Sequence, residues 1–184
     1  MLTVGVEGDD VFGLIIEAVH KHAPHAVQDA MYRLSGHLAG KVRDAIIRQT
    51  QDWPPLFPRY AKWKAKHGLD ERVLRATGQY VQSIVPRRVG DSYVVSASPN
   101  AHVDPRTGKP DPALPMTLLS IYLEYGFDVV GKDGRRHKMP PRPHFRPVYR
   151  EFQRRVLAGE SGVEAEVWDV LQKEIEVAVQ GGPR

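Results

Sequence analysis

Three histidines near the start of the chain are spaced closely enough to raise the question of a metal site. His20, His22 and His25 fall close together, and an HxH pair can bind a metal ion when it lies in a strand. Asp10 and the apolar residues after it instead predict a helix over residues 11–22. In a helix, His20 and His22 point roughly 200° apart and cannot share an ion. We therefore expect no metal ion and no cofactor.

The remaining candidates for catalysis are carboxylates in loops. Asp9, Asp10 and Asp111 are the acidic residues placed in such settings, and no second catalytic group is paired with them in the sequence. The chain has no cysteine, so it offers no thiol nucleophile. HExxH, GxSxG, phosphate-binding and dinucleotide-binding motifs do not occur either. The sequence therefore predicts a protein that is not an enzyme.

Length and composition are those of one soluble domain. The chain has 184 residues, of which 41% are hydrophobic and 26% are charged. We expect a single domain over residues 1–184, with a core at about 24–180 and a frayed tail at 181–184. No apolar run approaches the ~20 residues that span a bilayer, and the first residues lack the features of a signal peptide. These observations predict a cytosolic protein that makes no membrane contact.

Charge alternates along the chain. Residues 58–88 carry 8 basic and 2 acidic side chains, and residues 132–155 carry 9 and 2. The segments before, between and after them are net acidic. The two basic segments are typical of a nucleic-acid footprint, or of surfaces that meet acidic surfaces of other subunits. A third interpretation is that the charges balance within one fold.

The most unusual stretch is MPPRPHFRP at residues 139–147, with four prolines in nine residues. Proline fixes φ, removes a backbone donor and pushes the preceding residue toward extended conformations. The stretch is predicted to be a stiff, extended arm, with Pro147 in the first turn of the following helix. The arm is either a connector or a segment that presents Arg142, Phe145 and Arg146 to a neighbouring protein.

The elements that would position this arm are helices and hairpins. Apolar residues at steps of three and four predict a long helix at about 24–51 and C-terminal helices from 145 onward. Gly90-Asp91 and Asp133-Gly134 each lie between extended runs and predict antiparallel hairpins. Residues 99–115, rich in proline, are predicted to be a surface loop. The fold class expected is α+β, with a small, mostly antiparallel sheet packed by the long N-terminal helix and the C-terminal helices.

Several short motifs occur in a fixed order between residues 24 and 157. A long amphipathic helix precedes WPPLFPRYAKWK, followed by VLRATGQYVQSI, a hairpin, YLEYGF and MPPRPHF. This succession resembles the virion-morphogenesis family of tailed bacteriophages, which comprises tail-completion, neck and head–tail-joining proteins of Mu-like phages. Three departures from the family pattern are Tyr80 in place of leucine with one extra residue before Ser83, His144 inserted before Phe145, and a longer loop at 99–115.

The resemblance implies a structural virion protein that joins the phage head to its tail. Its expected partners are copies of itself, in a ring of six or twelve subunits, and the neighbouring connector and tail proteins. The expected location is the neck or tail end of a virion assembled in the host cytoplasm, with possible non-specific contact with DNA. Two alternatives stay open: a tail-terminator ring, or a basic nucleic-acid-binding protein that uses residues 58–88 and 132–155.

The candidate residues fall into two groups, one for an assembly interface and one for the structure of the fold. We expect the basic tip of the second hairpin, at Arg135 and Arg136, to meet an acidic surface such as the one carrying Glu160, Glu164 and Glu166. The assembly-interface candidates are Arg135, Arg136, Lys138, Pro140, Arg142, Pro143, Phe145 and Arg146. The structural candidates are Trp53, Leu56, Leu74, Thr77, Gly78, Ser83, Ile84 and Gly126. Gly126 is predicted to end a short helix that starts at Pro115, and Gly78 is predicted to have a positive φ.

Overall fold

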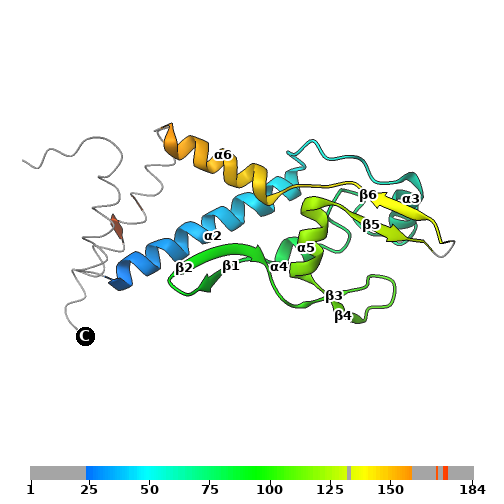
Figure 1. Ribbon diagram of the computed structural model, residues 1–184, viewed down its shortest axis with the longest axis horizontal. Coiled ribbons are helices and arrows are strands. Elements are labelled where there is room, and N and C mark those ends of the chain that lie inside the picture. The colour runs from blue at the N-terminus through cyan, green and yellow to red at the C-terminus, as the bar shows by residue number, and fades with distance from the viewer. Residues whose placement is uncertain (1–23, 132–133, 159–168, 170–171, 174–184) are drawn as a thin grey trace, which may run out of the picture.

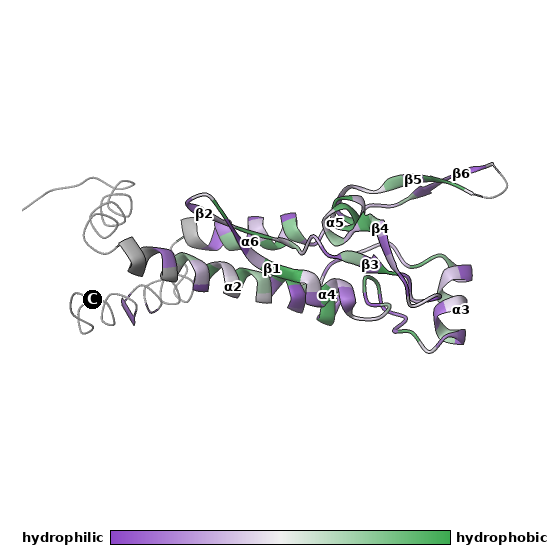
Figure 2. Cartoon of the chain, turned by 90° about the horizontal axis from the view of Figure 1, so that it is seen from below, coloured by the Kyte–Doolittle hydropathy of each residue, from purple (hydrophilic) through white to green (hydrophobic). Residues whose placement is uncertain are grey.

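The computed structural model describes residues 24–131, 134–158, 169 and 172–173. This part of the chain is elongated, with α2 and α6 toward one end and α3 and the β3–β4 and β5–β6 hairpins toward the other (Figure 1, Figure 2). The predicted α+β class is confirmed. The antiparallel strands form three separate two-stranded sheets.

Helix α2 (Pro24–Arg48) is the long helix that the apolar stripe predicted. Ala39, Val42, Ala45 and Ile46 are buried along one face, which packs against the β1–β2 hairpin. The helix ends because Gln49 adopts a left-handed conformation, with φ of 53°. The side chain of Gln49 then exchanges hydrogen bonds with the backbone of Val73, which ties the end of α2 to a distant loop.

Two short helices follow the proline-rich turn after α2. Helix α3 (Pro58–Lys66) begins with a proline in its first turn, where a missing N–H does no harm. Helix α4 (Gln79–Ser83) starts after Gly78, whose φ of 78° is left-handed, and runs directly into β1. The two helices therefore sit at either end of a loop that carries Leu74 in the unusual φ of 61°.

The first predicted hairpin is confirmed. Strand β1 (Ile84–Val89) pairs antiparallel with β2 (Ser92–Ala97), and Gly90-Asp91 forms the connecting turn. Pro86 lies in β1 opposite Val95, which a two-stranded sheet permits because each strand has an unpaired outer edge.

The prediction that residues 99–115 form only a surface loop is wrong. Strands β3 (Ala101–Val103) and β4 (Pro110–Pro115) make a short hairpin there, with a register shift between Ala101 and His102. Prolines discourage central strands but fit an edge strand, and every strand of a two-stranded sheet is an edge. The turn residues between the strands, around Gly108, stay at the surface.

The remaining elements lead to the arm. Helix α5 (Met116–Tyr125) stops at Gly126, as predicted, and strands β5 (Phe127–Val130) and β6 (Arg136–Met139) form the last hairpin. Residues 140–144 have no regular structure, and helix α6 (Phe145–Leu157) follows with Pro147 in its first turn. The predicted helix at 11–22, the predicted C-terminal helices beyond residue 158 and the histidine cluster at 20–25 lie outside the described residues or side chains.

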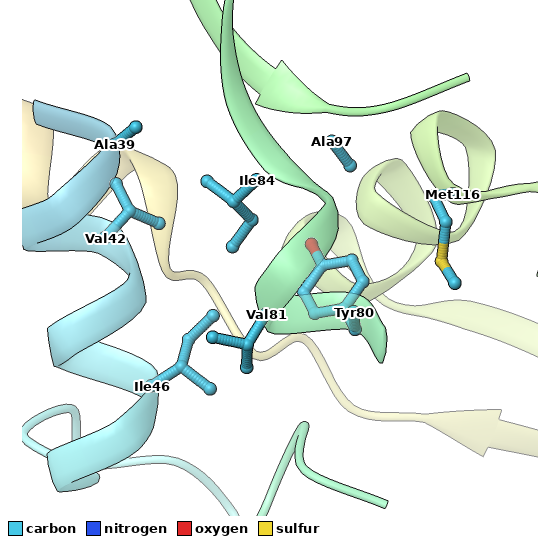
Figure 3. Close-up of a cluster of buried hydrophobic side chains, with 8 residues drawn as sticks. All are labelled: Ala39, Val42, Ile46, Tyr80, Val81, Ile84, Ala97 and Met116. Atoms are coloured by element: carbon cyan, nitrogen blue, oxygen red, sulfur yellow. The ribbon is translucent and has the colours of Figure 1, made fainter. Parts of the chain in front are cut away.

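The hydrophobic core is small and is built from elements far apart in the sequence. Figure 3 shows the α2 side chains facing α4 and β1, with Tyr80 reaching toward α5. The buried members are Ala39, Val42, Ile46, Tyr80, Val81, Ile84, Ala97 and Met116. Trp53, Leu74 and Phe145 pack against this cluster from the loops and the start of α6. The core thus joins the arm to the rest of the molecule.

Candidate functional site

The arm is anchored through Glu124, which lies in the last turn of α5. Its carboxylate accepts hydrogen bonds from the backbone N–H groups of His144, Phe145 and Arg146, at 2.8 to 3.1 Å. Glu124 is only 5% exposed. These donors belong to the first residues of α6 and to the residue before it, where helical N–H groups have no intrahelical partner. A side chain from one helix therefore caps the N-terminus of another, where a negative charge is favoured.

The guanidinium group of Arg146 completes the ring of donors around this carboxylate. Its Nε donates to Glu124 Oε1 at 3.0 Å, and one terminal nitrogen donates to the Glu124 backbone carbonyl at 3.2 Å. The same guanidinium lies over the ring of Tyr125, 4.6 Å from its centroid. Burial alone would raise the pKa of Glu124, but the three backbone donors outweigh it, and the pKa lies below its ordinary value. Glu124 is therefore a carboxylate held in its charged form.

His144 is fully buried and connects the arm to the core. Its Nδ1 lies 2.9 Å from the backbone carbonyl of Arg142, so this nitrogen carries the proton and donates it. Its Nε2 then accepts a hydrogen bond from the hydroxyl of Tyr80 in α4. Burial lowers the pKa of His144 and raises the pKa of Tyr80, in agreement with a neutral imidazole and a neutral phenol.

Two further contacts hold the arm, one to the proline-rich turn after α2 and one to α5. The indole Nε1 of Trp53 donates to the backbone carbonyl of Pro143 at 2.7 Å. The backbone N–H of Arg142 donates to the carbonyl of Leu123 at 2.7 Å. The arm is therefore fastened from both sides, by α5 and by the residues that follow α2.

These contacts correct the expectation that the arm presents Arg142 and Phe145 to a neighbour. Arg142 is 4% exposed and Phe145 packs on the core, so neither side chain projects outward from the arm. Arg146 remains partly exposed but is bonded to Glu124. The inserted His144 supplies the reason, because its hydrogen bond to Tyr80 draws the arm inward. Pro140 and Pro143 are half-buried beside them.

A cavity of about 770 Å³ is lined in part by Arg142. Its walls come from the turn before α3, α3 itself, residues 73–80, the β3–β4 hairpin, α5 and the arm. Apolar walls include Leu56, Leu74 and Leu119. Phe57 and Tyr60 line it while remaining exposed, so the cavity opens to solvent. Sites that bind ligands or peptide side chains have this size and this mostly apolar character.

Two buried cations face this cavity. Lys64 in α3 is 1% exposed, and its Nζ donates to the backbone carbonyl of Arg72 at 2.8 Å. Arg142 donates from one terminal nitrogen to the carbonyl of Pro55 at 3.3 Å, while its Nε has no hydrogen-bond partner among the described residues. Burial lowers the pKa of both side chains. Neither cation has a carboxylate partner in the part of the chain that the structure describes.

The residues expected to be structural occupy turns and the core. Gly78 has the left-handed φ expected of it, and Thr77 Oγ1 accepts a hydrogen bond from the backbone of Gln79. Ser83 donates to the carbonyl of Tyr80, and Ile84 is fully buried. Trp53 and Leu74 pack against the core, and Leu56 lies in the wall of the cavity. At Gly126, with φ of 78°, an added Cβ would lie 2.7 Å from the carbonyl oxygen of Met139.

The basic tip of the β5–β6 hairpin is at the surface. Arg135, Arg136 and Lys138 are exposed. The acidic residues expected to meet them, Glu160, Glu164 and Glu166, lie outside the described residues. Two apolar residues of β5, Val129 and Val130, are exposed beside this tip.

Sequence reasoning missed Glu124, Lys64 and Tyr80 as organising residues. A signal existed for Glu124, because it is the one acidic residue in the otherwise apolar run MTLLSIYLEY. Such a residue on an apolar helix needs a partner when it is buried. Lys64 sits in a run where lysines alternate with aromatic and small residues, and nothing local distinguishes it from Lys62 or Lys66.

Among the described residues there is no group of three potential metal-ligating side chains. No helix of that part of the chain is long and apolar enough to cross a membrane. Comparisons of the chain with protein-family models, with characterised proteins and with solved structures gave no match. The sequence motifs and the geometry of the arm and the cavity are therefore the basis for assigning a function.

Proposed function

We propose that this protein is a structural component of a phage virion, a tail-completion or neck protein that forms a ring between head and tail. The observation that carries the proposal is the set of three separate two-stranded hairpins with open edges. A strand edge offers unpaired backbone groups, and proteins that stay monomeric usually cover it. Two-stranded sheets are also marginal on their own, so further packing would stabilise them.

Exposed apolar side chains lie on or beside these hairpins. Val89 and Val94 are exposed on the β1–β2 hairpin, Tyr125 on α5 is 63% exposed, and Val130 on β5 is 65% exposed. Single exposed apolar residues are ordinary, but several on neighbouring open strands favour an interface with other subunits. The order of the motifs from the long helix to the arm supports the same class of protein.

The proposal is tested by the size of the purified protein and by its place in the virion. We expect light scattering coupled to size exclusion to give a multiple of the 20.7 kDa chain, and negative-stain images to show rings. Labelled antibody should bind the neck or tail end of intact particles. A protein that stays monomeric at high concentration and is missing from particles would contradict the proposal. A ring found at the end of tails that have not joined heads would favour a tail terminator.

A matched pair of variants separates assembly from folding. Val130→Asp places a charge on an exposed apolar position of β5 and should abolish the ring while leaving the melting temperature within a few degrees. Gln82→Asp places the same charge on an exposed polar position and should leave the ring intact. If both variants assemble normally, the β5 edge is not an interface.

A nucleic-acid-binding role remains the second candidate because of α3. Tyr60 and Trp63 stack at 5.7 Å on this helix, and the exposed Lys62 and Lys66 lie in the same basic helix. Aromatic rings with basic neighbours can hold single-stranded nucleic acid. Binding to DNA that weakens steeply as salt rises, together with a monomeric protein, would favour this candidate over the ring.

A further inference from the structure

The cavity beside α3 is lined by two buried cationic side chains that have no carboxylate partner among the described residues. Arg142 and Lys64 are both buried in its wall, among apolar side chains such as Leu74, Leu119 and Leu123. Burying a cation is costly unless its donors are bonded to an acceptor. A buried polar group without a partner calls for a physical explanation, and a group that binds beside it is one such explanation.

One side-chain donor in the cavity wall lacks a hydrogen-bond partner among the described residues. Arg142 Nε has no hydrogen-bond partner among the described residues, and the one side-chain bond of Arg142 is a long one to the Pro55 carbonyl. A guanidinium group binds a carboxylate through two parallel donors, including Nε. The backbone contacts of the arm fix Arg142 in place, so its side chain is already oriented before any ligand arrives.

The nearby carboxylates are already used. In the cavity wall, Asp104 is held by Arg106 at 2.9 Å, and Asp111 accepts a hydrogen bond from the backbone N–H of Ala113 at 3.0 Å. Asp70, outside the wall, is held by Arg72 and Arg75, at 2.7 and 3.0 Å. Within the described part of the chain, the one hydrogen-bond acceptor of Lys64 is the backbone carbonyl of Arg72. The cavity thus fits an incoming carboxylate that is attached to an apolar group.

We propose that this cavity binds an apolar, acidic segment of a second copy of the chain, residues 2–10, LTVGVEGDD. The segment combines three apolar side chains with Glu7, Asp9 and Asp10, and it contains no lysine or arginine. Its composition matches a cavity with apolar walls and two buried cations.

The segment is assigned to another copy because the proposed ring requires a contact between two different surfaces of the chain. Helix α2 begins at Pro24, at the end of the molecule remote from α3 and the cavity (Figure 1). Its 25 residues span roughly 37 Å at 1.5 Å per residue. A segment leading into Pro24 that reaches the cavity of the next copy joins two different surfaces. Such a head-to-tail contact closes into a ring when its rotation divides a full turn. The inference therefore rests on the proposed ring and names a contact within it.

Fluorescence anisotropy with the full-length protein and a labelled peptide of residues 2–10 tests the proposal. We expect saturable binding of the peptide. We expect binding about 10–100-fold weaker for the neutral peptide E7Q/D9N/D10N, since a charged hydrogen-bonded partner is lost. Arg142→Met should weaken binding to a similar extent, and Arg150→Met, an exposed arginine of α6 outside the cavity, should leave it unchanged.

The controls make each result decisive. If Arg142→Met does not fold, Lys64→Met takes its place. Equal binding of the acidic and neutral peptides, or of the wild type and both cavity variants, overturns the proposal. Decanoate, a free apolar carboxylate, should displace the peptide; binding of decanoate without binding of the peptide overturns the assigned occupant. A ring that forms while the peptide fails to bind refutes this contact alone. Peptide binding by a protein that never forms a ring keeps the acidic, apolar ligand of the cavity but refutes both the proposed ring and the assignment of the segment to another copy.

Discussion

Glu124 and Arg142 are both buried charged side chains, about twenty residues apart in the sequence, but their surroundings differ. The carboxylate of Glu124 accepts three backbone hydrogen bonds and one from Arg146. Among the residues that the structure describes, the guanidinium group of Arg142 makes one long side-chain bond, and its Nε has no partner. The region around Glu124 is complete within the chain, and the region around Arg142 is not.

The comparison distinguishes Glu124, a buried charge that stabilises the fold, from Arg142, a buried charge that we propose contacts a binding partner. A buried charge with all its hydrogen bonds made is costly to remove, because its partners are left unsatisfied. A buried charge with few partners contributes little and is often replaceable by an apolar side chain. The stability of variants can therefore test the assignment of each region.

The largest effect is expected for Glu124→Ala. The change strands three backbone donors at the start of α6 and should lower the free energy of unfolding by about 3–5 kcal/mol. Glu124→Gln keeps one acceptor oxygen and should cost less. Chemical denaturation monitored by circular dichroism measures both. A loss below 1 kcal/mol for Glu124→Ala would mean that water or other groups replace the carboxylate, and that the network is not structural.

Next in size is the comparison of two glycines with the same φ. Gly126→Ala places a Cβ 2.7 Å from the Met139 carbonyl oxygen and should cost about 3 kcal/mol. Gly78→Ala meets no atom within 4 Å and should cost only the left-handed backbone penalty, about 1 kcal/mol. Melting temperatures of the two variants give the comparison. Equal losses would show that β6 moves aside to admit the new methyl group.

A smaller effect is expected from pH. Burial lowers the pKa of His144 in the folded chain below the ordinary 6.5. As pH falls below 6.5, the unfolded chain takes up a proton that the folded chain does not, so stability decreases until pH passes the folded pKa. The decrease due to Glu124 begins lower, below about 4.5, because its folded pKa is also depressed. His144→Gln should flatten the stability profile between pH 6.5 and 4.5, and an unchanged slope there would exclude this histidine as the cause.

The smallest effect is expected for Arg142→Met in the isolated protein. An apolar side chain of similar length removes a poorly paired buried cation, so stability should change by less than about 1 kcal/mol or rise slightly. The same denaturation measurement applies. A loss near that of Glu124→Ala would mean that Arg142 is part of the structural network and would remove the contrast between the two regions.

The elements with local signals were predictable from the sequence. The stripe through Val42 and Ile46 predicted α2, Gly90-Asp91 predicted the β1–β2 turn, and Gly126 predicted the end of α5. These features depend on neighbours a few residues away, which a pattern can reveal. The β3–β4 hairpin was missed because its prolines resemble those of a loop, and only the absence of a further strand beside it makes them acceptable.

The candidate site was only partly predictable, because its contacts join distant residues. The stiffness and extended form of the arm follow from Pro140, Pro141 and Pro143 alone. Its direction does not, since it depends on Tyr80 and Glu124, which lie 64 and 20 residues from His144. The unpaired donor of Arg142 is likewise invisible in the sequence, because it is defined by what surrounds the side chain.

The hydrogen bond from Trp53 to Pro143 has a consequence for synthesis. It spans 90 residues, and the arm also supplies the partners of Tyr80 and Glu124. Chains emerge from the ribosome N-terminus first, at about 5–20 residues per second. Helix α2 and the first hairpin can therefore form while the groups that will hold the arm are still without it. The native fold is completed only after residues 142–146 have left the exit tunnel. For several seconds the core of the nascent chain is therefore covered by α2 and the first hairpin but not by the arm.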